Sequence, residues 1–290
     1  MTRYTGASPR GFIPLSAREI DVLFRLGLHR YLYRSHVEEL VFEGSGLTPR
    51  SREVVTERVL RSLKRRGLVG ATARVVAGPQ RRSAPPAYFL TDAGYRLAAT
   101  LDPGLTARRP PFRGAQFMGH ALMTADVALA IRRCARGHPG HSLVEWECDW
   151  HAAERLGTLF VVPDAHFVYR TATCTIDALV EVDLGTERAS RFARKVDAYL
   201  DLYRDGSWRA LLKTWPLVLT VTPSEDRATA LRRATESLLA SAPDADSIAD
   251  ATEFAFTSLP TLHGPLGPLG KIWRVAGKSG VRSVIPEGHE

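Results

Sequence analysis

The sequence predicts two domains of mixed helix and strand: a small helical domain with a β-ribbon, followed by a larger α/β layer domain. The chain has 290 residues, which exceeds one typical domain. Its charge separates into two segments of opposite sign. Residues 50–82 carry ten basic and two acidic side chains, whereas residues 143–187 carry nine acidic and two basic ones. A stretch rich in Pro and Arg, residues 106–117, lies between them and predicts a linker.

The composition indicates a cytoplasmic globular protein with a polyanionic partner. The net charge is +8, and the fractions of hydrophobic and charged residues, 44% and 24%, are ordinary for such proteins. The three cysteines form no C-x-x-C pair, which argues against a structural zinc site. No apolar run approaches the roughly 20 residues that span a bilayer, and no G-x-x-x-x-G-K-[ST] loop occurs. We therefore expect neither a membrane partner nor a nucleotide cofactor.

The N-terminal third predicts three short helices. Ser16 and Glu19 have the spacing of a capping box, and apolar residues follow them at helical period as far as Leu28. A second helix is expected over residues 34–42. A third, over residues 51–66, places apolar side chains on one face and arginines elsewhere.

A β-ribbon follows the third helix. Strands are expected over residues 69–76 and 87–90, with a basic tip between them, and Thr91 caps a fourth helix that ends at Leu101. Three helices followed by a ribbon is the order of a winged helix-turn-helix domain, which we place at residues 14–105. Its expected partner is double-stranded DNA, and the alternatives are a solvated basic face or a protein-binding winged helix. The predicted DNA-binding residues are Arg50, Arg52, Arg58, Arg61, Lys64, Arg65, Arg81 and Arg82.

The second domain is expected over residues 118–260 with the element order αβββαβαβ. The ranges that predict it are 118–136, 143–149, 159–169, 174–184, 187–204, 216–222, 224–240 and 252–258. Residues 261–290 are rich in Gly and Pro and predict a loose tail.

Acidic residues on the second and third strands predict a metal site. Glu181 and Asp183 alternate with apolar residues, so both project to one face of their strand. A hairpin with the preceding strand brings Asp164 near them. Three oxygen ligands without cysteine favour Mg²⁺ or Mn²⁺, held by Asp164, Glu181 and Asp183.

This pattern resembles the PD-(D/E)XK nuclease core, a restriction-endonuclease-like fold. Pro163-Asp164 lies on one strand and Glu181-Val182-Asp183 on the next. The chain departs from the pattern at Asp183, where these nucleases usually carry lysine. Some members supply the lysine from the following helix, so the resemblance implies catalytic roles for Asp164, Glu181, Asp183 and Lys195. An ion pair between Asp183 and Lys195 that only joins strand to helix is the structural alternative.

Over residues 15–240 the chain resembles the replication-relaxation family of mobile elements. The segments that carry the resemblance are Leu28-His29-Arg30-Tyr31-Leu32, Leu63-Lys64-Arg65-Arg66-Gly67-Leu68-Val69, Tyr88 to Gly94, Glu181 to Glu187 and Val221-Thr222-Pro223-Ser224. The resemblance implies involvement in plasmid replication or in relaxation of plasmid DNA.

Two functions therefore stay open. The leading one is a Mg²⁺-dependent DNA endonuclease or nickase, with recognition in the first domain and chemistry in the second. The rival is a winged-helix replication or transcription regulator whose nuclease-like domain is inactive and serves dimerisation or a second DNA contact. A homodimer fits either function, and no heptad pattern identifies its interface.

Overall fold

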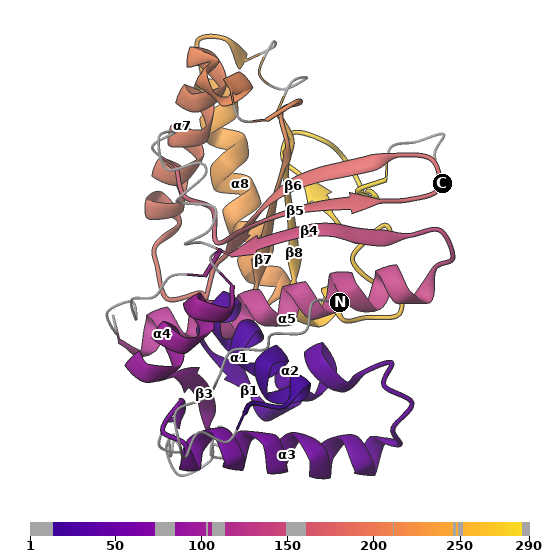
Figure 1. Ribbon diagram of the computed structural model, residues 1–290. Helices are drawn as coiled ribbons and strands as arrows, with labels where there is room; N and C mark the ends of the chain where they lie inside the picture. The colour runs from indigo at the N-terminus through magenta and orange to yellow at the C-terminus, as the bar shows by residue number, and fades with distance from the viewer. Residues whose placement is uncertain are drawn as a thin grey trace, which may run out of the picture. The chain divides into compact units, whose positions relative to one another are not determined.

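The computed structural model describes residues 14–72, 85–102, 104–105, 114–148, 161–210, 212–245, 248 and 252–285 (Figure 1). The chain forms two compact units, Met1–Pro111 and Phe112–Glu290. Both contain helices and strands, so the mixed helix and strand content that the sequence predicts is confirmed.

The first unit combines short helices with a small antiparallel sheet. Its helical elements are α1 (Ala17–His29), α2 (Arg34–Val37), a π-helical turn (Glu38–Phe42), α3 (Pro49–Arg65) and α4 (Asp92–Leu101). Its strands are β1 (Leu32–Tyr33), β2 (Val69–Ala71) and β3 (Ala87–Leu90), in the order β1-β3-β2. The predicted capping box is present, because Ser16 and Glu19 exchange side-chain hydrogen bonds with each other's backbone.

Helix α3 packs through one face. Val55, Val59, Leu60 and Leu63 are buried there, as the period of the sequence predicts. The helix begins earlier than expected, because Pro49 occupies its first turn directly after the Thr48 cap. The predicted ribbon tip, with Arg81 and Arg82, lies outside the described residues.

Gly94 is required where α4 approaches the sheet. A Cβ at this position would lie 2.1 Å from the Leu68 carbonyl oxygen, a distance that no side chain tolerates. The Leu68 carbonyl in turn accepts a hydrogen bond from the Thr91 amide at 3.0 Å, so the start of α4 is fixed against the end of α3.

The second unit is a six-stranded mixed sheet with helices on both faces (Figure 1). Its helical elements are α5 (Ala115–Gly137), α7 (Ala189–Asp205), a 3₁₀ turn (Ser207–Ala210), α8 (Glu225–Ser241) and α10 (Leu259–Leu262). Its strands are β4 (Ser142–Cys148), β5 (Ala165–Arg170), β6 (Thr175–Val182), β7 (Leu217–Thr222), β8 (Phe254–Ser258) and β9 (Arg274–Val275), paired in that order.

Strand direction divides this sheet. β4, β5 and β6 are antiparallel, whereas β6, β7 and β8 are parallel. One apolar layer joins α5 to the sheet, and the other joins α7 and α8 to it. Alternation along β6 sends Val180 and Val182 toward α5 and Leu179 toward α7 and α8. α7 follows β6 and α8 follows β7. Because β6 and β7 are parallel, both strands end at the same edge of the sheet, where both helices begin.

The C-terminal segment differs from the predicted loose tail. Its described part, residues 261–285, adds β9 to the sheet edge and buries Leu269, Ile272 and Trp273 in the layer beneath α5. The Trp273 indole N–H donates to the Pro268 carbonyl at 2.8 Å. The Gly and Pro residues make turns, and the apolar residues between them return to the core. The predicted linker also ends sooner than expected, because α5 already includes residues 115–117.

Candidate active site

Asp164 and Glu181 lie side by side on neighbouring strands. Register pairs Ala165 of β5 with Val180 of β6, so Asp164, which directly precedes β5, lies opposite Glu181 of β6. The Asp164 amide donates to the Val180 carbonyl at 3.0 Å, and Asp164 Oδ2 accepts from the Val182 amide at 2.8 Å. The hairpin thus brings these two carboxylates together, as the sequence led us to expect.

Glu181 is the buried centre of the site. Only 2% of its side chain is exposed. Lys195 Nζ donates to Oε2 and the Tyr199 hydroxyl donates to Oε1, both from α7. Burial raises the pKa of Glu181 to about 7; Lys195 opposes this rise, and the negative charge of Asp164 adds to it. Glu181 consequently changes its charge in the neutral pH range.

Lys195 and His120 compensate the two carboxylates. Burial would lower the pKa of Lys195, but Glu181 and Asp164 hold it well above its usual range. His120, on α5, has Nδ1 3.8 Å from Asp164 Oδ1, and its interaction with this carboxylate raises the pKa of the imidazole. Burial would raise the pKa of Asp164, yet Lys195 and His120 keep it below its usual value. The site thus alternates negative and positive groups within a few ångströms.

Asp183 faces the same side of the sheet but has a different partner. Arg227, in the first turn of α8, donates from Nε to Oδ1 at 2.7 Å and from Nη2 to Oδ2 at 2.8 Å. The Gly185 amide adds a third hydrogen bond at 2.7 Å. The alternative ion pair between Asp183 and Lys195 is therefore wrong. Asp183 stays a predicted metal ligand only on the condition that Arg227 releases one of its oxygens.

A cavity of about 270 Å³ opens over these groups. Its polar lining residues are His120, Glu181, Asp183, Thr186, Glu187, Arg191 and Lys195. The Arg191 side chain is 67% exposed, so the rim carries a cation that solvent reaches. The cavity combines a negative floor with positive groups at its edge, an arrangement that can accommodate a hydrated cation next to a phosphate.

Sequence reasoning missed Arg227 and the hydroxyl of Tyr199. The Tyr199 ring packs in the core, with its centroid 6.3 Å from that of Phe254, and its hydroxyl donates to Glu181. A signal for Arg227 existed in the topology. β6 and β7 are parallel neighbours, so a residue just after β6 lies beside the helix that follows β7.

Helix α3 of the first unit presents a separate candidate surface. On the side away from its apolar face, Arg50, Arg58, Arg61, Lys64 and Arg65 are exposed. Arg61 pairs with Glu57 at 2.5 Å, and Arg52 is half-buried. The exposed cations follow the helix over about four turns, which suits contact with a series of phosphates.

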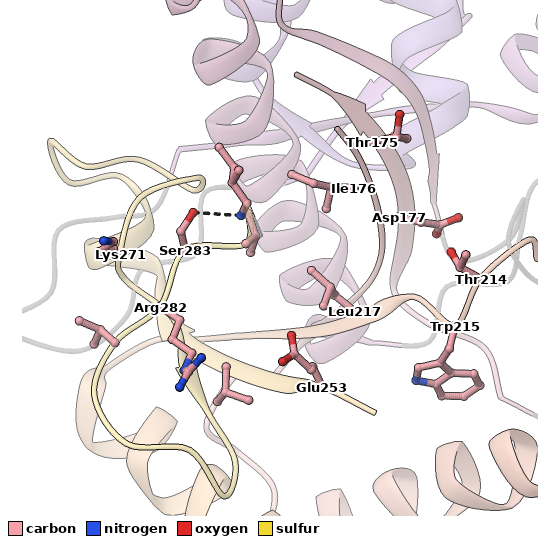
Figure 2. A pocket seen from close by; sticks show the side chains of 14 residues that line it. Thr175, Ile176, Asp177, Thr214, Trp215, Leu217, Glu253, Lys271, Arg282 and Ser283 are labelled. Atoms are coloured by element: carbon pink, nitrogen blue, oxygen red, sulfur yellow. Dashed lines mark hydrogen bonds between the residues drawn. The ribbon is translucent and has the colours of Figure 1, made fainter. Parts of the chain in front are cut away.

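A larger cavity of about 500 Å³ lies at the opposite end of β6 (Figure 2). Figure 2 shows Asp177 beside Thr214 and Trp215, with Arg282 across the cavity. The lining includes the acids Asp177 and Glu253 and the bases Lys271 and Arg282, so neither sign of charge dominates. This mixture gives no indication of a ligand class, unlike the acidic site.

Two further observations concern the length of the helices and the similarity of the chain to known proteins. Among the described residues, no helix has the length and apolar composition that a bilayer crossing requires. None of the curated proteins and none of the solved structures compared with the chain matches it. The family model described as replication-relaxation matches residues 23–218, about two thirds of the chain. The chain therefore belongs to the replication-relaxation family, which indicates a role in the replication of plasmids or other mobile elements.

Proposed function

We propose that this protein binds double-stranded DNA through its first unit and cuts one or both strands in its second unit, with Mg²⁺ or Mn²⁺ as cofactor. The observation that carries the catalytic half is the Lys195–Glu181 contact beside Asp164. In the PD-(D/E)XK pattern that the sequence resembles, a lysine next to two acidic residues lies at the scissile phosphate.

The first unit supports DNA binding through its element order. Three helical segments, a small sheet and the apolar packing of α3 support a winged helix-turn-helix, in which α3 would be the helix that enters the major groove. The exposed Arg58, Lys64 and Arg65 of α3 would then contact phosphates or base edges. Counterion release on such contacts makes affinity steeply salt-dependent, which separates this function from protein binding.

The second unit supports cleavage through the position of its lysine. In the PD-(D/E)XK pattern the lysine follows the second acidic residue by two positions, where this chain has Asp183. Lys195 reaches Glu181 from α7 instead, and so restores a cation at the same carboxylate. Its charged ammonium would polarise the phosphate, while His120 holds Asp164 in place.

The chemistry of the donors fits a divalent cation at Asp164 and Glu181. Mg²⁺ is commonly bound through one or two carboxylates with water in the other positions. The raised pKa of Glu181 reflects burial close to a like charge, an environment that a cation would relieve. A bound ion of this class supplies an activated water and neutralises charge on the phosphodiester.

A second function, a regulator without catalysis, is favoured by the pairing of Asp183. Arg227 takes both of its carboxylate oxygens, and Lys195 and Tyr199 occupy Glu181. The cations of Lys195 and Arg227 therefore already compensate these acidic groups, which suits a domain that has kept its fold without catalysis.

Incubation of supercoiled plasmid with the purified protein and Mg²⁺ separates the two functions. Cleavage predicts nicked or linear product that requires Mg²⁺ and disappears in Glu181→Gln and Asp164→Asn. Asp201→Asn is the matched control, because this carboxylate is 76% exposed on α7. Unchanged plasmid topology together with full DNA affinity would assign the regulator function.

A further inference from the structure

A second cluster of potential metal ligands lies on β4 and β5, on the same face of the sheet as Asp164 and Glu181. Glu145, Glu147 and His166 each offer a ligand atom, and these atoms all lie within 4.8 Å of one another. Register pairs Glu147 directly with His166, and Glu145 lies two residues away on the same side of β4. The strands themselves therefore fix the three side chains.

The imidazole at the centre of this cluster is buried between carboxylates. His166 is 2% exposed; its Nε2 lies 2.8 Å from Asp177 Oδ1 and its Nδ1 lies 3.3 Å from Glu147 Oε2. A neutral imidazole has one N–H, and an ionised carboxylate only accepts. If Nε2–H donates to Asp177, the Nδ1 lone pair faces the Glu147 oxygen. In that tautomer Nδ1 is the nitrogen that can bind a metal ion, and it lies on the side of Glu147.

We propose that Glu145, Glu147 and His166 bind a divalent transition-metal ion of the Mn²⁺ and Zn²⁺ class, with Asp177 as the outer partner of the imidazole. An imidazole with two carboxylates suits these ions better than Mg²⁺ or Ca²⁺, which prefer oxygen ligands alone. Histidine ligands commonly donate their other N–H to a carboxylate, and the short contact from Nε2 to Asp177 provides that bond. The ion also offsets the mutual repulsion of the carboxylates.

This site shares no ligand with the one at Asp164 and Glu181. His166 lies two residues beyond Asp164 on β5, which separates their backbones by roughly 7 Å along the strand. On β6 the buried Leu179 lies between Asp177 and Glu181. The proposal goes beyond DNA cleavage and does not depend on it.

Isothermal titration of the metal-depleted full-length protein with ZnCl₂, and separately with MnCl₂, tests the site. Mn²⁺ can also bind at the site proposed at Asp164 and Glu181, so the ion assigned to this second site is the one per chain that remains bound in Glu181→Gln. Glu145→Gln is the main variant, because this residue is exposed and the change preserves shape, and it should weaken affinity at least tenfold. Glu147→Gln should do the same, and Asp177→Asn should weaken affinity by roughly 10- to 100-fold, as outer partners do. Asp226→Asn, an exposed acid on α8, should leave affinity unchanged.

Two results would overturn the proposal. Wild-type protein that binds neither ion would leave His166 as a structural partner of Asp177 and Glu147 alone. Binding that Glu145→Gln and Glu147→Gln leave intact but Glu181→Gln abolishes would assign the ion to the other site. Unchanged far-UV circular dichroism of the variants excludes unfolding as the cause of weakened binding. The readout is metal affinity, so absence of plasmid cleavage has no bearing on it.

Discussion

Lys195 of α7 donates to Glu181 of β6, so that a lysine with 35% of its side chain exposed neutralises a carboxylate with 2% exposed. This pair links the solvent side of the cavity to its buried floor. Lys195→Met keeps most of the aliphatic volume and removes the charge. If the pair acts on a phosphate, cleavage of supercoiled plasmid should fall about 100-fold or more, as when a donor to developing negative charge is removed.

The matched control for this change is Arg194→Met, an exposed cation on the same helix, which should retain wild-type cleavage and DNA affinity. If Lys195→Met retains full cleavage, Lys195 has no catalytic role and only forms the ion pair with Glu181.

The pKa of Glu181, about 7, predicts a pH dependence of metal binding. Below pH 7 a proton competes with the ion for this carboxylate, so the half-saturating Mg²⁺ concentration should rise up to tenfold per pH unit. Tyr199→Phe removes a hydrogen bond that favours the ionised form of Glu181. The pH below which Mg²⁺ binding weakens should therefore be higher in this variant. Plasmid cleavage measured against Mg²⁺ concentration from pH 5.5 to 8.5 checks both statements. A Mg²⁺ requirement that does not change with pH would contradict the first, and identical profiles for wild type and Tyr199→Phe would contradict the second.

The raised pKa of Glu181 also makes the free energy of unfolding depend on pH. The pKa of Glu181 is higher in the folded chain than its ordinary value of 4.5. Between these values the native state holds a proton that the unfolded state has released, so the contribution of Glu181 to the free energy of unfolding decreases as pH rises from about 4.5 to 7. Urea denaturation of wild type and Glu181→Gln across this range should show the decrease in wild type and a flatter dependence in the variant.

The bidentate pair between Arg227 and Asp183 predicts a stability effect. Arg227→Met leaves the Asp183 carboxylate, 8% exposed, without its guanidinium partner. Removal of one partner from a buried pair costs about 3 kcal/mol or more in the free energy of unfolding. Urea denaturation measures this, with Arg233→Met, an exposed arginine on the same helix, as control. A loss below about 1 kcal/mol would indicate that Asp183 relaxes into water.

Local sequence patterns predicted the strands β5 and β6, and with them the pairing of Asp164 with Glu181. Both residues belong to one hairpin, whose register depends on alternation alone. Arg227 lies 44 residues from Asp183, and their contact requires the parallel pairing of β6 with β7 as well as the entry angle of α8. No local period contains that information, and the sequence therefore favoured the nearer cation, Lys195, as the alternative partner.

The C-terminal segment shows a different limit of local reasoning. Gly and Pro were interpreted as signs of a loose tail, yet they mark turns between Leu269, Ile272 and Trp273, which are all buried. A single tryptophan in a stretch rich in Gly has no periodic pattern that would predict its burial. It is buried by the sheet edge and by α5, and these contacts form only in the folded chain.

Trp273 therefore predicts a core-sized loss of stability from a segment that looks dispensable in the sequence. Its side chain is 2% exposed and its indole N–H is bonded to Pro268. Trp273→Ala should lower the free energy of unfolding by about 3 kcal/mol or more. Val281→Ala, a change at a position with 42% exposure in the same segment, should cost much less. Equal urea midpoints for Trp273→Ala and wild type would mean that the segment detaches in solution.

Exposed cations on α3 predict a change in the salt dependence of DNA binding. Arg58 and Lys64 are exposed on this helix, so Arg58→Ala and Lys64→Ala should each weaken duplex binding and lower the slope of log affinity against log salt by about 1 for every phosphate that the variant no longer neutralises. Arg96→Ala, an exposed arginine on α4, is the control. Fluorescence anisotropy with a labelled duplex at 50–300 mM salt, about the range where such slopes are measured, gives the readout. Weaker affinity without a change of slope would point to base recognition, whereas unchanged affinity in both variants would remove α3 from the DNA interface and leave the partner of its basic face to be sought among proteins.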